Sequence, residues 1–127
     1  MIMNLGVDII SVKRVQSNMN ADEYLYRLFS EKEIKEASRS NNIIIYFAER
    51  FAGKEAILKC ILDVYDDFSW SDIAILTGDY GQPYVSFSPL FLKQMTKKGY
   101  RIASSQISLS GEDEYVIAVA QVQLEEI

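Results

Sequence analysis

Two acidic residues lie inside otherwise apolar stretches of this chain, and they are the first candidates for chemistry. Asp8 interrupts the apolar, β-branched run Met1 to Ile10, and Glu55 lies within the proline-free run Ile43 to Leu62. A carboxylate that loses its hydration is costly unless a cation or hydrogen-bond donors compensate it. Two such carboxylates suit Mg²⁺, which takes one or two protein carboxylates and fills its shell with water and phosphate oxygens.

Basic residues flank the second of these acids. Arg50 and Lys54 precede Glu55 in the same run, where they could hold phosphates while Glu55 holds a metal ion. Two bland alternatives stay open. Glu55 could pair with a buried arginine or hydroxyl and have no other role, because structural ion pairs also bury carboxylates. Asp8 could close a strand and cap the segment that follows it.

Several other chemistries are excluded by residue type. The chain has no histidine, so histidine-based catalysis and histidine-ligated zinc are absent, and its serines lack the base of a hydrolase triad. Gly53-Lys54 is no phosphate-binding loop, because that motif needs glycine in place of Ala48 and serine or threonine in place of Glu55. Cys60, with no histidine to activate it, is expected in the core.

Composition favours one ordinary globular domain over residues 1–127, with 49% apolar and 24% charged residues. The net charge of −5 disfavours nucleic acid or an anionic membrane as the main partner, although lysine and arginine are unevenly placed along the chain. Met1 to Val7 lacks the features of a signal peptide, and no apolar run could span a bilayer. With a single cysteine, these features predict a cytoplasmic protein.

The helical part of the pattern centres on Ile43 to Leu62, which predicts one long helix. At roughly 100° per residue, Glu55 falls near the centre of an apolar stripe that must face a core. That stripe consists of Ile44, Phe47, Ala48, Phe51, Leu58 and Leu62. Before it, a short helix is expected over Val12 to Met19, and Asn20 and Asp22 open another. The capping box Ser30 to Glu33 starts a polar helix that ends near Ser38.

The strand pattern completes an α+β domain. Strands are predicted at Ile73 to Thr77 and Tyr84 to Phe87, and a proline-started helix then runs from Pro89 to Gly99. Further strands follow at Gln106 to Ser110 and Tyr115 to Leu124. The last strand has one apolar face made by Val116, Ala118, Ala120 and Val122 and another made by Ile117 and Val119. This pattern predicts cover on both faces, which a second subunit could provide.

The order and spacing of four stretches resemble the holo-acyl-carrier-protein synthases, the small trimeric type of phosphopantetheinyl transferase. The stretches are Gly6 to Ile10 with Lys13 to Val15; Arg27 to Ser30 with Glu33; Phe47 to Ala56, the most specific; and Trp70 to Ile73 and Gly81 to Pro83 with Ile107 to Ser110 and Tyr115. Together they cover nearly the whole chain. The resemblance implies a single α+β domain in which a long central helix packs on a mainly antiparallel sheet, assembled as a homotrimer.

The resemblance also implies a reaction. Such enzymes move the 4′-phosphopantetheine arm of coenzyme A to a serine of an apo acyl or peptidyl carrier protein, as in fatty acid biosynthesis, and release 3′,5′-ADP. By resemblance, Asp8 and Glu55 would bind magnesium together with the pyrophosphate. Lys54 would contact phosphate and assist the serine hydroxyl or the leaving group, and Arg50 would hold coenzyme A phosphates. Phosphoryl transfer of this kind needs positioning and charge neutralisation more than a strong protein nucleophile.

Further contacts are implied away from the carboxylates. The segment Gly81, Gln82 and Pro83 would lie near the nucleotide, and Ser110 would also contact the cofactor. Arg14 would meet the acidic carrier protein. The active sites of the family lie between neighbouring subunits, in agreement with a last strand that is apolar on both faces.

Several departures from the family pattern support an alternative, a catalytically impaired relative that binds coenzyme A or a carrier protein. Gly111 stands where many members have histidine, Tyr80 replaces a small polar residue, and Asp63 lies where a glycine-rich turn is usual. Asp22 and Glu23 make the docking segment acidic. Retention of the two buried acids and the lysine opposes this alternative. A third reading, a structural oligomerisation domain, leaves those acids unexplained.

Overall fold

The structure, a computed structural model, describes residues 1–19 and 22–127. The strands are β1 (Ile2–Ser11), β2 (Ile73–Thr77), β3 (Pro83–Phe87), β4 (Tyr100–Gly111) and β5 (Tyr115–Glu126). The helices are α1 (Val12–Gln16), α2 (Asp22–Leu28), α3 (Glu31–Ala37), α4 (Ile43–Ile61), the short 3₁₀ helix η1 (Trp70–Asp72) and α5 (Pro89–Lys97). This content confirms the α+β class; Asn20, expected to open a helix, lies outside the described residues.

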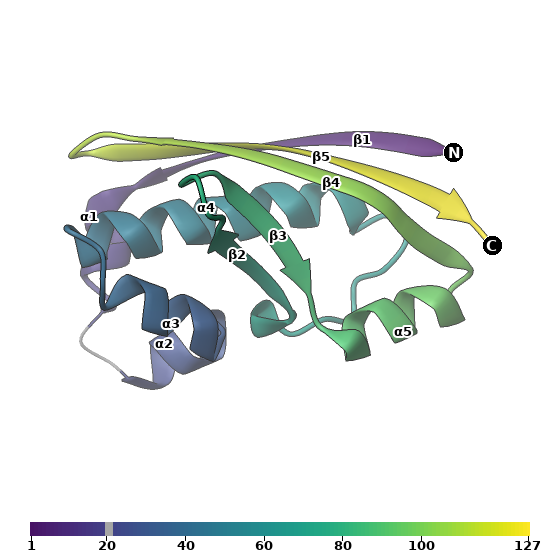
Figure 1. The fold of residues 1–127 in the computed structure, drawn as a ribbon, viewed down its shortest axis with the longest axis horizontal. Helices are drawn as coiled ribbons and strands as arrows, with labels where there is room; N and C mark the ends of the chain where they lie inside the picture. Colours follow the sequence, from purple (N-terminus) through teal and green to yellow (C-terminus); the bar gives the residue numbers. More distant parts are fainter. Residues whose placement is uncertain (20–21) are drawn as a thin grey trace.

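The molecule is layered around α4. An antiparallel sheet in the order β1-β5-β4 covers one side of the helix, and the β2-β3 hairpin lies on another (Figure 1). The helices α2, α3 and α5 lie below α4 in that view, away from the large sheet. Within the described residues, no helix has both the length and the apolar composition needed to cross a membrane.

The long helix was predicted to within one residue, and it is buried on nearly all sides. Asn42 caps its first turn, since its side-chain oxygen accepts a hydrogen bond from the Ile45 N–H at 3.1 Å. The approach to β1 is closest at Gly6, where an added Cβ would overlap the carbonyl oxygen of Ala56. Only glycine allows the two backbones to come so near. As a result, the inward-facing side chains that follow on β1, Asp8 first among them, lie directly over the helix.

Several boundaries differ from the sequence expectation. Helix α1 ends at Gln16 rather than Met19, and β4 begins at Tyr100 rather than Gln106. Strand β4 extends further back because it pairs along its length with β5, with an irregularity in register between Ile102 and Ser104. Such pairing with a distant segment is invisible to a local pattern.

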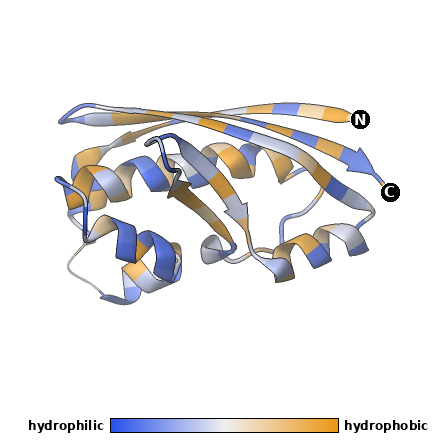
Figure 2. Cartoon of the chain, viewed as in Figure 1, coloured by the Kyte–Doolittle hydropathy of each residue, from blue (hydrophilic) through white to orange (hydrophobic). Residues whose placement is uncertain are grey.

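Both faces of the sheet are apolar, as the pattern in β5 predicted, but they differ in exposure to solvent. Its inward-facing residues Val116, Ala118, Ala120, Val122 and Leu124 are at most 1% exposed. The outer face is also apolar, and hydrophobic residues are frequent along the upper strands in Figure 2. The large apolar side chains exposed on it are Met3, Leu5, Val7, Ile9, Tyr115, Ile117 and Val119, hereafter the outer sheet face. An apolar surface of this extent is typical of an interaction site.

Candidate active site

Asp8, Glu55 and Lys59 form a charged cluster where β1 crosses α4. The Lys59 ammonium lies 3.4 Å from Asp8 Oδ1 and donates to the Val7 carbonyl oxygen at 2.7 Å. Glu55 and Lys59 are one helical turn apart on the same face of α4, where residues four apart are neighbours. The cluster lies at the protein surface: the Asp8 side chain is 14% exposed and that of Lys59 is 50% exposed.

The charges in this cluster influence one another. Burial, and then the Asp8 charge, raise the pKa of Glu55, whereas the Lys59 and Arg14 charges lower it. Arg14, on α1, is therefore close to the carboxylates and is exposed to solvent. The two acids predicted from the sequence are brought together, with a lysine and an arginine around them. Two carboxylates held close in this way favour a bound cation.

The donor set fits a magnesium ion better than a metal bound only by protein. Asp8 Oδ2 is buried and has no hydrogen-bond partner among the described residues. Because buried polar atoms are normally paired, this oxygen is available to a bound cation or donor. No group of three or more metal-binding side chains occurs in the part of the chain that the structure describes. Magnesium is usually bound by one or two carboxylates, with substrate phosphates and water as further ligands. Asp8 and Glu55 could supply those two carboxylates.

The role expected for Lys54 does not fit its position. Its side chain is fully buried, and its ammonium donates to Glu33 Oε1 at 2.7 Å and to the backbone carbonyls of Trp70 and Ile73. All three N–H donors are used, so Lys54 cannot reach a phosphate. Burial lowers its pKa, and the charge of Glu33 together with its hydrogen bond opposes that shift. Lys54 is thus the most deeply buried charged residue on α4. Glu55 was expected inside the core, but it lies at the edge of the core.

Arg50 also faces away from the carboxylate cluster, toward β2. Its Nε donates to the Ile75 carbonyl at 3.3 Å, its Nη2 donates to Thr77 Oγ1 at 2.7 Å, and its guanidinium lies 4.1 Å from the centre of the Tyr46 ring. Glu36 is close by, 4.0 Å from Nη2. Arg50 lines a pocket here and could still present its remaining donors to an anion.

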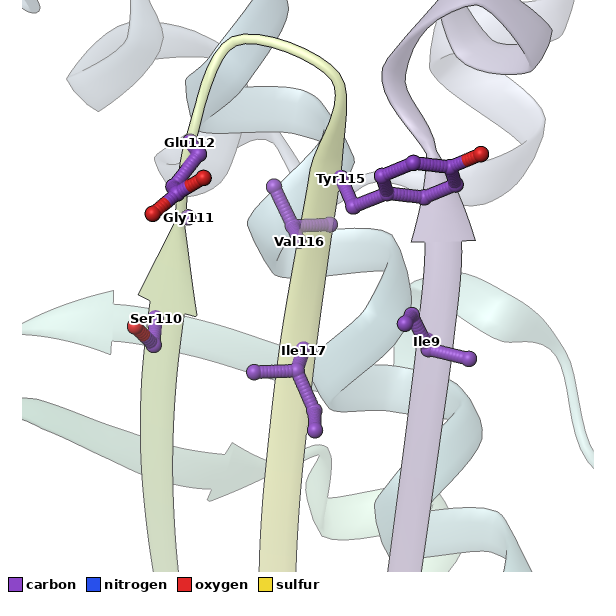
Figure 3. Close-up of a pocket in the computed structure, with 7 residues that line it drawn as sticks. All are labelled: Ile9, Ser110, Gly111, Glu112, Tyr115, Val116 and Ile117. Atoms are coloured by element: carbon purple, nitrogen blue, oxygen red, sulfur yellow. The ribbon is translucent and has the colours of Figure 1, made fainter.

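The other predicted cofactor contacts lie elsewhere on the chain. Gly81 and Gln82 lie in the turn between β2 and β3, Pro83 begins β3, and Gly81 adopts a φ of 83°. Ser110 lies on the outer sheet face, in a row with Ile117 and Ile9 on the neighbouring strands. It lines a pocket of 230 Å³ near the β4-β5 turn (Figure 3). Asp8 faces the opposite side of the sheet, so one chain does not bring Ser110 and Asp8 together.

Comparison with known proteins identifies the family. The family model described as the 4′-phosphopantetheinyl transferase superfamily matches residues 4–120. The holo-[acyl-carrier-protein] synthase of Fusobacterium nucleatum is 32% identical over 122 residues, covering 94% of this chain and 98% of its own. The chain belongs to the holo-[acyl-carrier-protein] synthase family. The family predicted from the four sequence stretches, and the type of enzyme, are confirmed.

Further family members match this chain in sequence or in fold along nearly their full length. The holo-[acyl-carrier-protein] synthase of Oceanobacillus iheyensis is 34% identical over 128 residues, covering 98% of each chain. The crystal structure of the Neisseria meningitidis synthase superposes with a TM-score of 0.81 at 27% identity, covering 94% of this chain and 96% of its own. The Helicobacter pylori synthase in complex with coenzyme A gives 0.78 at 25% identity, covering 94% and 100%. The synthase fold is therefore present in full.

Two residues with important contacts, Lys59 in the charged cluster and Glu33 beside Lys54, were not predicted to make them. Lys59 had a detectable signal, because it lies four residues after Glu55 and so on the same helical face. Glu33 was predicted to end a capping box and was part of one stretch of the family resemblance, but no pairing with Lys54 was expected; it does complete the box by accepting from the Ser30 N–H at 2.9 Å. Its pairing with Lys54, 21 residues away, has no local signature.

The two lysines of α4 should respond oppositely to neutral replacement. Lys54→Met should lower the free energy of unfolding by about 3–5 kcal/mol, because it leaves the buried Glu33 charge uncompensated. Lys59→Met should change it by less than about 1 kcal/mol, since that ion pair is largely solvated. Urea denaturation at one fixed protein concentration measures both. Similar losses in the two variants would contradict the assigned roles.

The raised pKa of Glu55 predicts how stability depends on pH. Because the folded protein holds this proton more tightly than the unfolded chain, the group costs stability as pH rises through its ordinary pKa toward its raised one. With a chelator present, Glu55→Gln should therefore melt above the wild type at about pH 7. The difference should vanish below about pH 4, where both states are protonated. Glu31→Gln, on the exposed start of α3, is the charge-matched control, and a lower melting temperature for Glu55→Gln at neutral pH would refute the expectation.

Proposed function

We propose that this chain catalyses the magnesium-dependent transfer of 4′-phosphopantetheine from coenzyme A to a serine of an apo carrier protein, with release of 3′,5′-ADP. The observation that carries the proposal is the cluster of Asp8, Glu55 and Lys59 in a member of the holo-[acyl-carrier-protein] synthase family. Two close carboxylates and a solvent-accessible lysine suit a pyrophosphate with its metal ion. They do not suit an apolar ligand.

In this proposal Asp8 and Glu55 hold magnesium, which would neutralise the pyrophosphate charge and polarise the phosphorus that is attacked. The buried, unpartnered Asp8 Oδ2 supports this assignment. Lys59 takes the role that was expected for Lys54, since its side chain is half exposed and its ammonium lies 3.4 Å from Asp8 Oδ1. From there it stabilises negative charge on the leaving phosphate.

The transfer then needs only simple proton movement. The carrier serine oxygen forms a bond to the phosphorus that bears pantetheine, and the bond from that phosphorus to the bridging oxygen breaks. The bridging oxygen and its electron pair leave as part of 3′,5′-ADP. The serine proton passes to solvent water, so Glu55 is free to act as a metal ligand throughout the transfer.

Coenzyme A is the donor in this proposal. The structure of the Helicobacter pylori relative was determined in complex with it. Arg50, the turn Gly81 to Pro83 and Ser110 would contact its phosphates and nucleotide. These groups face away from Asp8 and Glu55 in one chain. A site that uses all of them requires a neighbouring subunit, and the outer sheet face offers an apolar surface for a homotrimer.

The acceptor is an acidic acyl or peptidyl carrier protein, which Arg14 would contact from α1. Burial raises the pKa of Tyr24, and the charges of Arg14 and Arg27 oppose that rise, so both arginines act on the same part of the surface. This gives a small basic surface beside the carboxylates. The acidic residues at the start of α2 oppose it, and they favour the second candidate function, a coenzyme A or carrier-protein binding module. A role in fatty acid biosynthesis and the cytoplasmic location stay predictions.

A mass-shift assay tests the reaction. Purified protein with coenzyme A and magnesium should add the mass of 4′-phosphopantetheine to several apo carrier proteins, as measured by intact-protein mass spectrometry. Asp8→Asn and Lys59→Met should each slow the transfer by about 100-fold or more, as expected for groups that stabilise charge in the transition state. If no carrier gains mass while coenzyme A still binds, the binding-module alternative replaces this proposal.

Sedimentation velocity tests the assembly. The wild type should sediment as a trimer at micromolar concentration. Val119→Lys should shift it to the monomer and remove transferase activity, because it places a charge in the centre of the outer sheet face. Leu90→Lys, which changes an exposed leucine on α5 outside that face, should do neither. An active wild-type monomer would contradict a site completed by a neighbour.

A further inference from the structure

A second pocket lies beside Arg50, on the side of α4 that faces β2. Its volume is 340 Å³, and it is lined by Glu36, Arg39, Ser40, Tyr46, Arg50 and Thr77. It contains groups suited to an anion: two arginines and the buried Ser40 hydroxyl, which has no partner among the described residues. It also contains a carboxylate, which does not suit an anion. The charge balance in this pocket therefore decides what it binds.

Arg50 is held in one orientation in this pocket. Its Nε and Nη2 donate to fixed acceptors on β2, and its planar group stacks on Tyr46. The residue is only 8% exposed. This arrangement leaves Nη1 without a hydrogen bond to any described residue, so Nη1 is the part of the guanidinium available to a phosphate.

Glu36 is held just as firmly on the other side. Its Oε1 accepts from the Tyr46 hydroxyl at 2.9 Å and from Thr77 Oγ1 at 3.0 Å, and its Oε2 accepts from the Thr77 N–H at 3.1 Å. It has no such short contact with Arg50, whose Nη2 is 4.0 Å away. The carboxylate is thus a fixed negative charge that Arg50 neutralises only in part. A phosphate bound to Arg50 would lie within a few ångströms of it, where repulsion is appreciable.

We infer that Glu36 is a specificity-determining residue that weakens the hold of Arg50 on a phosphate group of the nucleotide. The inference rests on the proposed function, in which Arg50 contacts coenzyme A phosphates. The 3′,5′-ADP that the reaction releases carries the same phosphates as the nucleotide part of the substrate. A carboxylate beside the arginine lowers the affinity for both, and so speeds departure of the product. Glu36 does this without touching the reacting atoms.

The test is the affinity of the apo protein for 3′,5′-ADP, measured by isothermal titration calorimetry with adenosine as the uncharged comparison. Glu36→Gln keeps the size of the side chain and removes its charge. It should bind 3′,5′-ADP about 10-fold more tightly, which is about 1.4 kcal/mol, and bind adenosine as the wild type does. Glu31→Gln, on the same helix with the same change in net charge, should stay within about twofold of the wild type.

Other results are equally decisive. Unchanged or weaker binding of 3′,5′-ADP by Glu36→Gln would overturn the inference and make Glu36 a support for Thr77 and Arg50. Glu36→Ala provides a second variant without the charge if the glutamine variant does not fold. Arg50→Gln should weaken 3′,5′-ADP binding, and if it does not, no phosphate reaches this pocket and the inference fails alone. If the wild type does not bind 3′,5′-ADP at all, the proposed function itself fails.

Discussion

The buried ion pair between Lys54 of α4 and Glu33 of α3 is the interaction on which the arrangement of the molecule depends. Lys54 also donates to the carbonyls of Trp70 and Ile73, and Glu33 also accepts from the Ile75 N–H at 3.0 Å. One pair of charges therefore ties α3, η1 and β2 to the central helix. Burying it is costly, and the cost is offset only because every donor and acceptor is satisfied. Any rearrangement of these elements would leave a charge alone in the core.

This constraint divides the charged residues of α4 between two tasks. Neighbouring positions on a helix point about 100° apart, so Lys54 can face β2 while Glu55 faces β1. The glycine at position 6 lets β1 approach closely enough for Asp8 to join Glu55 and Lys59. The same helix thus stabilises the fold with one face and carries, on another, the carboxylate that we propose for the metal and phosphate site. Core stability and the proposed chemistry therefore fall on adjacent residues.

Much of this could be predicted from the sequence, and the failures have physical reasons. The proline-free run predicted α4 closely, and the two acids inside apolar stretches predicted the cluster. Lys54 was expected beside the phosphate, but the structure places it in the core, because a helix buried on nearly all sides has no single apolar stripe that identifies its core face. Its partner Glu33 is distant in the chain. The separation of Ser110 from Asp8 was also beyond prediction, since strand pairing decides which face each side chain takes.

The central proposal is that Asp8 and Glu55 form one metal site in which the bound metal also contacts the coenzyme A pyrophosphate. The most direct measurement is an anomalous difference map from crystals grown with coenzyme A and Mn²⁺, which replaces magnesium and has a measurable anomalous X-ray signal. The account predicts a single strong peak between the two carboxylates, in contact with pyrophosphate oxygens and next to the Lys59 ammonium. Ordered coenzyme A with no peak at that position, or with a peak that neither carboxylate touches, would contradict it.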